Sequence, residues 1–167
     1  PLSERTNRVL YVARFVPGKR HEILKQLATN FPNLEFVSAG LLRDSDQGWF
    51  KNFSKDLPAN YHLKPNLSEA ELIELFQDST IYCHLMQGEH FGIAPMEALA
   101  SGCITIVHDS GGSGEFIPKE FRWTTFEDLK AAIAKLHSSD AFASWEKRKD
   151  ELRAKISVLR PEKFQDI

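Results

Sequence analysis

The feature that most constrains the fold is the alternation of short apolar runs with helix-forming segments along the chain. Six runs have the length and composition of strands, and the segments between them carry apolar residues at helical spacing or helix-cap signals. The expected strands cover residues 8–15, 34–39, 61–65, 81–86, 104–108 and 121–124. Apolar strands that alternate with helices are typical of a parallel sheet covered on both faces. The sequence therefore predicts an α/β fold, a Rossmann-like doubly wound parallel sheet, with 61–65 as an edge strand.

Helix start and stop signals separate these strands. Ser68 and Glu71 form a capping-box pattern ahead of an apolar face. Pro95 stands where the first turn of a helix tolerates proline, and Gly102 stands where that helix would end. The expected helices cover residues 20–31, a short piece within 41–60, a segment from 68, about 95–102, 126–137 and 141–157.

Size and composition favour one soluble domain. The chain has 167 residues, and a chain of this length can bury a single sizeable core. Its net charge of −2 gives no electrostatic reason to expect nucleic acid as a partner. No apolar run reaches the ~18 residues that cross a bilayer, and no secretory signal is present, so a cytoplasmic location is expected. The start at Pro1 suggests a piece of a longer protein, although trimmed ends would look the same.

The segment 89–112, EHFGIAPMEALASGCITIVHDSGG, carries the strongest functional signal. If a helix begins near Pro95, Glu89 lies in the loop before it and Glu97 lies in its first turn. Both carboxylates can then face one crevice at the carboxyl edge of the sheet, where they suit the vicinal hydroxyls of a ribose or hexose. The alternative is that Glu97 is a partner of the helix dipole and Glu89 is a solvated loop residue.

Backbone groups of the same segment suit an anionic ligand. Phe91, Gly92 and Ile93 would present successive N–H groups before the helix, with Phe91 itself packed beneath the turn. His90 lies inside the motif, and the sequence leaves open whether it contacts a ligand.

A second glycine turn follows the strand at 104–108. Gly111 and Gly112, after Ser110, permit positive φ and would leave room for a diphosphate or a sugar. A plain tight turn is the alternative for this motif.

Two cations follow the first strand. Arg14 stands at its carboxyl end and Lys19 stands in the adjoining loop, where a guanidinium and an ammonium suit the phosphates of a nucleoside diphosphate. Pre-placed cations would also stabilise the charge that develops on such a leaving group. Neighbouring Arg20 is expected to be solvated, as lone basic residues usually are.

The remaining polar candidates give no metal site. The six histidines do not cluster with carboxylates at metal-ligand spacing, and His84 and His108 are expected to pack or to hydrogen-bond. Cys83 and Cys103 lack a CxxC pairing, so buried thiols are favoured over a disulfide or a metal site.

Together these motifs resemble a known family. R-x4-K after the first strand, E-x-F-G-I-x-x-x-E-A, and a strand that ends in S-G-G resemble the family 4 retaining glycosyltransferases of the GT-B fold. More narrowly, EHFGI and HDSGG are similar to the dolichol-pathway α-1,2-mannosyltransferases and to bacterial and archaeal relatives that use GDP-mannose. The resemblance spans roughly residues 9–136.

The resemblance implies that residues 1–167 are the carboxyl-terminal, donor-binding domain, with 141–167 as a helical extension. It implies that Arg14 and Lys19 hold the donor diphosphate, Glu89 bonds hydroxyls of the transferred sugar, and Glu97 bonds the ribose. The amides of residues 91–93 would touch sugar and phosphate, and no divalent metal or other cofactor is expected. The sequence departs from the family pattern at three places. The family has Gly-Arg where this sequence has Ala13-Arg14, glycine where it has Arg20, and G-x-G where it has Ala39-Gly40.

The resemblance also implies a missing part. An amino-terminal acceptor domain of about 150–200 residues would complete such an enzyme, and an acceptor at a membrane surface would be reached through it. Alone, the chain is expected to bind a nucleotide-sugar donor without turnover. The alternatives are a non-catalytic nucleotide-sugar binding or regulatory module, and a different GT-B-type enzyme such as a sugar-nucleotide epimerase.

Overall fold

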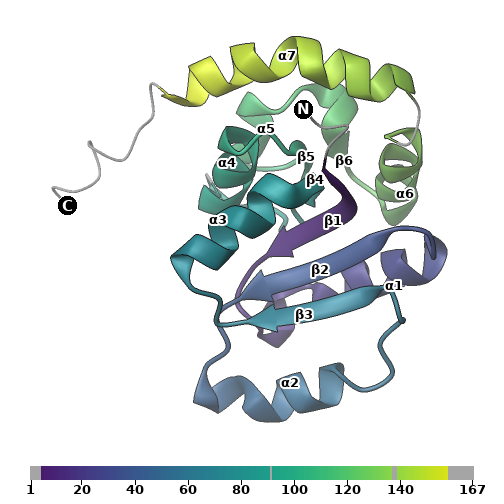
Figure 1. Ribbon diagram of the computed structural model, residues 1–167, viewed down its shortest axis with the longest axis vertical. Helices are drawn as coiled ribbons and strands as arrows, with labels where there is room; N and C mark the ends of the chain where they lie inside the picture. The colour runs from purple at the N-terminus through teal and green to yellow at the C-terminus, as the bar shows by residue number, and fades with distance from the viewer. Residues whose placement is uncertain (1–4, 91, 137–138, 158–167) are drawn as a thin grey trace, which may run out of the picture.

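A computed structural model describes residues 5–90, 92–136 and 139–157, and contains one six-stranded parallel sheet (Figure 1). The strand order is β3-β2-β1-β4-β5-β6, and each pair of neighbouring strands in it is parallel. The strands are β1 Thr6–Val12, β2 Glu35–Gly40, β3 Tyr61–Pro65, β4 Ser79–Cys83, β5 Ile104–His108 and β6 Arg122–Trp123. This order is that of a doubly wound nucleotide-binding sheet, so the predicted fold class is confirmed.

Helices cover both faces of the sheet because alternate strand residues point to opposite sides. Val9 and Tyr11 of β1 belong to a core cluster with Leu24 and Leu27, whereas Leu10 belongs to a second cluster. The first cluster joins the sheet to α1 (His21–Asn30) and α6 (Phe126–Lys135). The second joins it to α3 (Glu69–Asp78) and α4 (Ile93–Ala100). The result is a three-layer sandwich in which α1 lies behind β2 and α3 lies in front of the sheet in Figure 1.

The remaining helices lie at the periphery. They are α2 (Gln47–Phe53), α5 (Ser113–Phe116), α7 (Ser139–Ser157) and the 3-10 turns Pro17–Lys19, Asp44–Asp46 and Lys119–Phe121. The long helix α7 contacts α4 and α5 and crosses the top of the molecule in Figure 1. Trp145 anchors it: the ring is fully buried and meets Phe121 edge to face at 4.8 Å. The helix expected at 141–157 is observed as Ser139–Ser157. Residues 158–167 lie outside the described part, and the interpretation of 141–167 as an extension stays a prediction.

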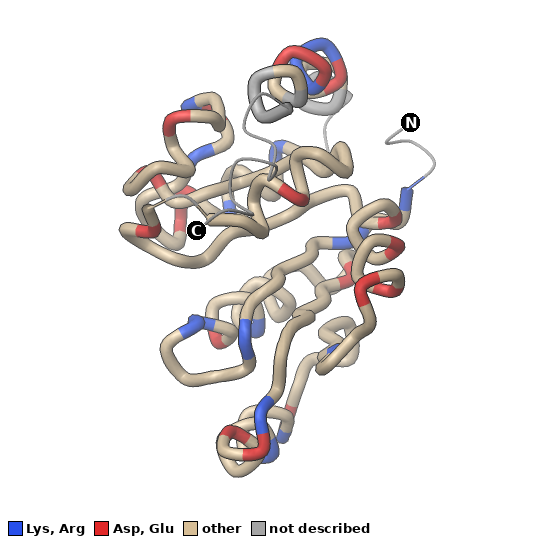
Figure 2. Tube along the Cα trace, turned by 90° about the vertical axis from the view of Figure 1, so that its left-hand side faces the viewer, with Lys and Arg blue, Asp and Glu red and all other residues tan. Residues whose placement is uncertain are grey.

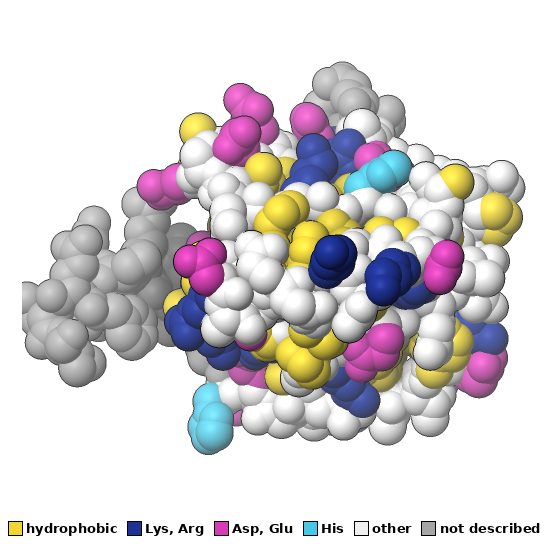
Figure 3. Space-filling view, turned by 90° about the horizontal axis from the view of Figure 1, so that it is seen from below, with side chains coloured by type: hydrophobic (Ala, Val, Ile, Leu, Met, Phe, Trp, Pro, Cys, Tyr) yellow, Lys and Arg dark blue, Asp and Glu magenta, His cyan; other side chains and the backbone are white. Residues whose placement is uncertain are grey.

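Charges of both signs are distributed over the surface. On α7, Lys and Arg alternate with Asp and Glu (Figure 2). The face seen from below carries Lys and Arg side chains between acidic and apolar ones (Figure 3). Within the described ranges, no helix combines the length and the apolar character needed to cross a bilayer.

Local signals located the helices better than the strand ends. Ser68 accepts from the Glu71 N–H and Thr125 accepts from the Asp128 N–H, each within a complete capping box. The strand expected at 8–15 ends at Val12, and the one expected at 81–86 spans Ser79–Cys83. The helix expected near Pro95 begins at Ile93, so Pro95 is its third residue. Proline is tolerated there because the first N–H groups of a helix have no intrahelical partner.

A close backbone contact fixes the end of β1. Gly40, at the end of β2, has φ 152°, and a Cβ at this position would lie 1.9 Å from the carbonyl oxygen of Ala13. Ala13 in turn donates its N–H to the Ala39 oxygen at 2.9 Å. Gly40 is the glycine of the family's G-x-G pattern that this sequence keeps, and it is the one that this packing requires.

A buried histidine holds the loop that follows β1. His21 has no exposed surface, and its Nε2 lies 3.0 Å from the Arg14 carbonyl oxygen. Since a carbonyl only accepts, Nε2 carries the proton and Nδ1 accepts from the Ser38 hydroxyl at 3.1 Å. The Ser38 oxygen then accepts from the Tyr61 hydroxyl at 2.7 Å. Burial, aided by the charge of Lys19, lowers the pKa of His21 to about 4.

Arg20 adopts a backbone conformation that favours glycine. It precedes α1 with φ 57° and ψ 29°, at the position where the family resemblance leads one to expect glycine. It was expected to be solvated, and this is wrong: Arg20 is partly buried and its Nη1 donates to the Leu85 oxygen at 3.3 Å. Since Leu85 follows β4, this bond joins the loops after β1 and β4.

The stability of the fold should fall in acid because of His21. The folded pKa lies below the ordinary value of 6.5, so the unfolded chain binds the proton more tightly between pH 6.5 and 4. The contribution is complete above pH 6.5 and is lost toward pH 4, by about 3 kcal/mol in total. Urea unfolding at pH 7, 6 and 5 measures this loss. His21→Asn should flatten the slope in this window, and an identical slope in both proteins would contradict the assignment.

Two substitutions separate backbone strain at Arg20 from its hydrogen bond. Arg20→Ala and Arg20→Gly both remove the bond to Leu85, but only alanine keeps a Cβ in the left-handed conformation, which costs roughly 1–2 kcal/mol. We expect the free energy of unfolding of Arg20→Gly to be about 1 kcal/mol higher than that of Arg20→Ala. The difference is smaller than the full strain because glycine also makes the unfolded chain more flexible. Equal denaturation midpoints for the two variants would show that the strain is absent.

Candidate functional site

Three loops meet at the carboxyl edge of the sheet. The loop 13–20 follows β1, the loop 84–92 follows β4, and the loop 109–112 follows β5. β1 and β4 are adjacent in the sheet, but β1 continues through α1 to β2 on one side and β4 continues through α4 to β5 on the other. Such a reversal leaves a crevice at the ends of the two strands, where ligands of doubly wound sheets bind. Arg14, Lys19 and Glu89 all lie in the two loops that flank this point.

The loop after β1 is tied down through its backbone. The Tyr11 hydroxyl donates to the Lys19 oxygen at 2.7 Å, and His21 donates to the Arg14 oxygen at 3.0 Å. The Arg14 side chain is exposed and that of Lys19 is partly exposed. The fold therefore fixes the main chain of both cations while their side chains remain accessible to solvent.

Glu89 is held in its ionised form. Its Oε2 lies 2.5 Å from Nε2 of His84, a buried residue just past the end of β4. This hydrogen bond is the main cause of a lowered Glu89 pKa. Electrostatic interactions with His84 and Lys19 lower the pKa further, and partial burial opposes them. The charge of Lys19 thus acts on Glu89 from the loop on the other side of the β1/β4 reversal.

The glycine turn after β5 supports the main chain of Glu89. Gly111 has φ 80°, and a Cβ there would lie 2.2 Å from the Glu89 carbonyl oxygen. The Gly112 N–H donates to that oxygen at 3.0 Å, and the Gly88 N–H donates to Ser110 Oγ at 2.8 Å. The turn was expected to leave room for a ligand, and the structure gives it this further role of binding the neighbouring loop.

His108 contacts the same two loops through both of its ring nitrogens. Its Nδ1 lies 2.7 Å from Ser110 Oγ, and its Nε2 lies 3.1 Å from Nε2 of Gln87. The ring also meets Trp123 edge to face at 4.6 Å. The hydrogen-bonding role expected for His108 is confirmed, and its partners are residues of the crevice loops.

The start of α4 approaches the turn after β5. Gly92 caps α4 with φ 74°, and a Cβ there would lie 3.0 Å from Ser113 Oγ. Ile93 is 72% exposed at the first helical position, and His90 is also exposed. The prediction for Phe91 concerns a residue outside the described part of the chain.

Glu97 does not share the immediate surroundings of Glu89. Because α4 begins at Ile93, Glu97 lies in the second turn and not in the first, as had been expected. Partial burial of its carboxyl group and the like charge of Glu69, at the start of α3, raise its pKa, although the residue as a whole is exposed. The interactions of Glu97 thus point toward α3, whereas those of Glu89 point toward His84 and Lys19.

Sequence reasoning did not assign His84 to the site. A histidine inside the strand expected at 81–86 and five residues before Glu89 was the available signal, but strand residues usually pack. Only the turn at 85–89 brings the ring and the carboxylate together. Across the described ranges, no group of three or more His, Cys, Asp or Glu side chains could hold a metal ion.

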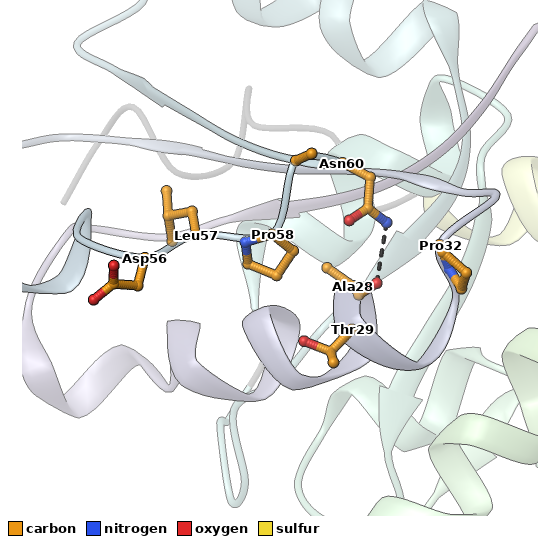
Figure 4. A pocket seen from close by; sticks show the side chains of 8 residues that line it. Ala28, Thr29, Pro32, Asp56, Leu57, Pro58 and Asn60 are labelled. Carbon is orange, nitrogen blue, oxygen red and sulfur yellow. Dashed lines mark hydrogen bonds between the residues drawn. The ribbon is translucent and has the colours of Figure 1, made fainter.

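An open depression lies at the opposite edge of the sheet (Figure 4). It is formed by the end of α1 and the segment before β3, with Ala28, Pro32 and Leu57 among its lining residues. Asn60 closes its floor: Nδ2 donates to the oxygens of Ala28, Phe31 and Leu34 at 2.8–3.1 Å. These bonds cap the end of α1, so the depression is a feature of helix termination at the edge remote from Glu89.

The chain is similar in sequence to known transferases. The human GDP-Man:Man(3)GlcNAc(2)-PP-Dol alpha-1,2-mannosyltransferase is 30% identical over 176 residues, which cover 92% of this chain and 36% of the relative. The enzyme of the same name from Candida albicans is 34% identical over 127 residues, covering 65% of this chain and 21% of the relative. The chain thus spans well under half the length of these curated relatives.

Solved structures share the fold at lower identity. The catalytic domain of cholesterol-alpha-glucosyltransferase from Helicobacter pylori superimposes with a TM-score of 0.71 at 18% identity, covering 92% of this chain and 98% of that one. The C-terminal domain of a glycosyl transferase group 1 family protein from Francisella tularensis gives a TM-score of 0.73 at 15% identity, with coverage of 93% and 87%. The family model for "Glycosyl transferases group 1" matches residues 1–156. This chain therefore belongs to the group 1 glycosyl transferases, of the GT-B type.

Proposed function

We propose that this chain binds the nucleoside diphosphate sugar of a glycosyltransferase that moves a hexosyl group with retention. The observation that carries the proposal is the placement of Lys19 and ionised Glu89 at the β1/β4 reversal, within electrostatic range of each other. A cation for phosphate and a carboxylate for hydroxyls at one crevice match the two ends of such a donor. A module that only binds nucleotide-sugar would not need cations at the leaving group.

The cations act on the diphosphate. Arg14 and Lys19 contact its oxygens from the loop after β1, with the guanidinium suited to bidentate contact. As the glycosidic bond breaks, negative charge gathers on the departing nucleoside diphosphate, and fixed cations lower the energy of that state. The main chain of this loop is held by Tyr11 and His21, so the cations need little reorganisation.

The remaining predicted residues bind the rest of the donor. Glu89 accepts from hydroxyls of the transferred sugar, and Glu97 accepts from the ribose. The amides of Gly92 and Ile93 bind sugar and phosphate, with His90, Gly111 and Gly112 at the border of the site.

GDP-mannose is the proposed donor, because the relatives with sequence similarity are named for GDP-Man and alpha-1,2-mannosyl transfer. We further propose a lipid-linked or sugar acceptor, bound mainly by an amino-terminal domain of the whole protein. The reaction would need no divalent metal, since Arg14 and Lys19 supply the positive charge. A cytoplasmic position, at the periphery of a membrane, would suit such an acceptor.

Removal of either cation should weaken diphosphate binding selectively. Lys19→Ala and Arg14→Ala each remove a charge-assisted contact, so we expect the Kd for GDP to rise about 10- to 100-fold while guanosine is bound as before. Isothermal titration calorimetry with GDP and guanosine measures both. Lys51→Ala, an exposed cation on α2, is the matched control. Equal losses for GDP and guanosine would refute the phosphate role, and no binding of GDP-, UDP- or ADP-sugars at millimolar ligand would refute the donor site.

Glu97 should control recognition of the ribose. Glu97→Ala removes the acceptor for ribose hydroxyls, so the preference for GDP over 2′-deoxy-GDP should shrink by about tenfold. Competition calorimetry with the two nucleotides measures the ratio, with Glu74→Ala on the exposed side of α3 as the control. An undiminished preference in Glu97→Ala would remove this assignment.

A further inference from the structure

The contact between His84 and Glu89 is the least expected feature of the crevice. His84 is only 4% exposed, and its Nε2 lies 2.5 Å from Oε2 of Glu89. The backbone on both sides of the pair is fixed: the His84 oxygen accepts from Trp123 Nε1 at 3.2 Å, and the Glu89 oxygen accepts from the Gly112 N–H at 3.0 Å. The main chain of each residue is thus held by a neighbouring strand or loop.

A buried tyrosine determines which nitrogen of His84 carries the proton. The Tyr82 hydroxyl lies 3.4 Å from His84 Nδ1, and the two rings stack with centroids 6.2 Å apart. The Tyr82 oxygen also accepts a hydrogen bond from the backbone of Val12, and burial raises the Tyr82 pKa, so its proton stays in place. That proton is available to Nδ1. Since the ionised Glu89 can only accept, the single ring proton of His84 lies on Nε2, facing Glu89.

The other groups near Glu89 act in the same direction or do not titrate. Lys19 favours the carboxylate through its charge. Tyr11 and Tyr82 are buried, and the Glu89 charge helps to raise their pKa values, so both hydroxyls remain neutral. His84 is therefore the group whose removal should change the ionisation of Glu89 most.

We infer that His84 is a positioning residue for the sugar contact of Glu89. Its Nε2–H donates to Oε2 and fixes the carboxylate plane, so that Oε1 remains as an acceptor for a hydroxyl of the donor sugar. The relay runs from the Val12 N–H through Tyr82 and His84 to Glu89, and its direction makes Glu89 an acceptor and not a proton donor. This inference rests on the proposed function, because it concerns how the same carboxylate meets the sugar.

Three substitutions test the relay. His84→Gln places an amide donor near the position of Nε2, His84→Phe keeps a ring without a donor, and Tyr82→Phe removes the proton offered to Nδ1. Two readouts are needed. The pKa of the Glu89 carboxyl is measured by carbon NMR titration of the free chain, with Glu89→Gln to assign the signal. The gain in affinity for GDP-mannose over GDP is measured by calorimetry at pH 7.

We expect His84→Phe to raise the Glu89 pKa, because its main hydrogen-bond donor is lost, and to reduce the GDP-mannose gain about tenfold, with GDP affinity unchanged. His84→Gln should restore both quantities, and Tyr82→Phe should give intermediate values. The inference would be overturned if His84→Phe left the Glu89 pKa at its wild-type value. It would also be overturned if Tyr82→Phe changed neither the Glu89 pKa nor the affinities. Equal losses for GDP and GDP-mannose would overturn it too, since a merely structural role predicts them.

The two proposals fail in different ways. If the wild-type chain binds neither GDP nor GDP-mannose, the donor site and the sugar contact of Glu89 are both refuted, whatever the NMR titration gives. If GDP binds and GDP-mannose gains affinity, but His84→Phe changes neither that gain nor the Glu89 pKa, only the role of His84 is refuted. Thermal unfolding of each variant shows whether it is folded before these comparisons are made.

Discussion

The reversal of chain direction between β1 and β4 is the constraint on which the rest of the molecule depends. Two adjacent parallel strands must continue to helices on opposite faces of the sheet, so their outgoing loops separate and leave a crevice between them. No side chain needs to be removed to open this space. The sequence can then place charged residues such as Lys19 and Glu89 on the separating loops at no expense to the hydrophobic core.

Rigid backbone contacts make this crevice a fixed feature. Gly40 and Gly111 each sit where any Cβ would overlap a neighbouring carbonyl, and each lets two loops approach to hydrogen-bonding distance. Buried histidines complete the support: His21 bonds the carbonyl of Arg14, His108 bonds the turn at Ser110, and His84 bonds the Glu89 carboxylate. Loops held in this way present charges without the entropy that a mobile loop would lose on binding.

The comparison with solved domains separates what the fold needs from what the site needs. Structures at 15–18% identity share the sheet and its helices, so the architecture follows from the alternation of apolar strands and capped helices and tolerates wide changes in residue identity. Function depends on fewer positions. In this chain, Arg20 in a left-handed conformation and His84 bonded to Glu89 support the loops at this edge within the same sheet architecture.

The sequence by itself determined the strand and helix order, the capping box at Ser68, and the edge of the sheet at which Arg14, Lys19 and Glu89 lie. These features depend on local periodicity and on the rule that parallel strands end at one edge, both of which are readable from residue spacing. Only the tertiary structure decided where α4 begins, and this places Glu97 in the second turn, near the charge of Glu69. Only the tertiary structure decided the hydrogen bonds of His21, His84 and Arg20. Those outcomes depend on distances between residues remote in sequence or on the path of a turn, and a linear pattern contains neither.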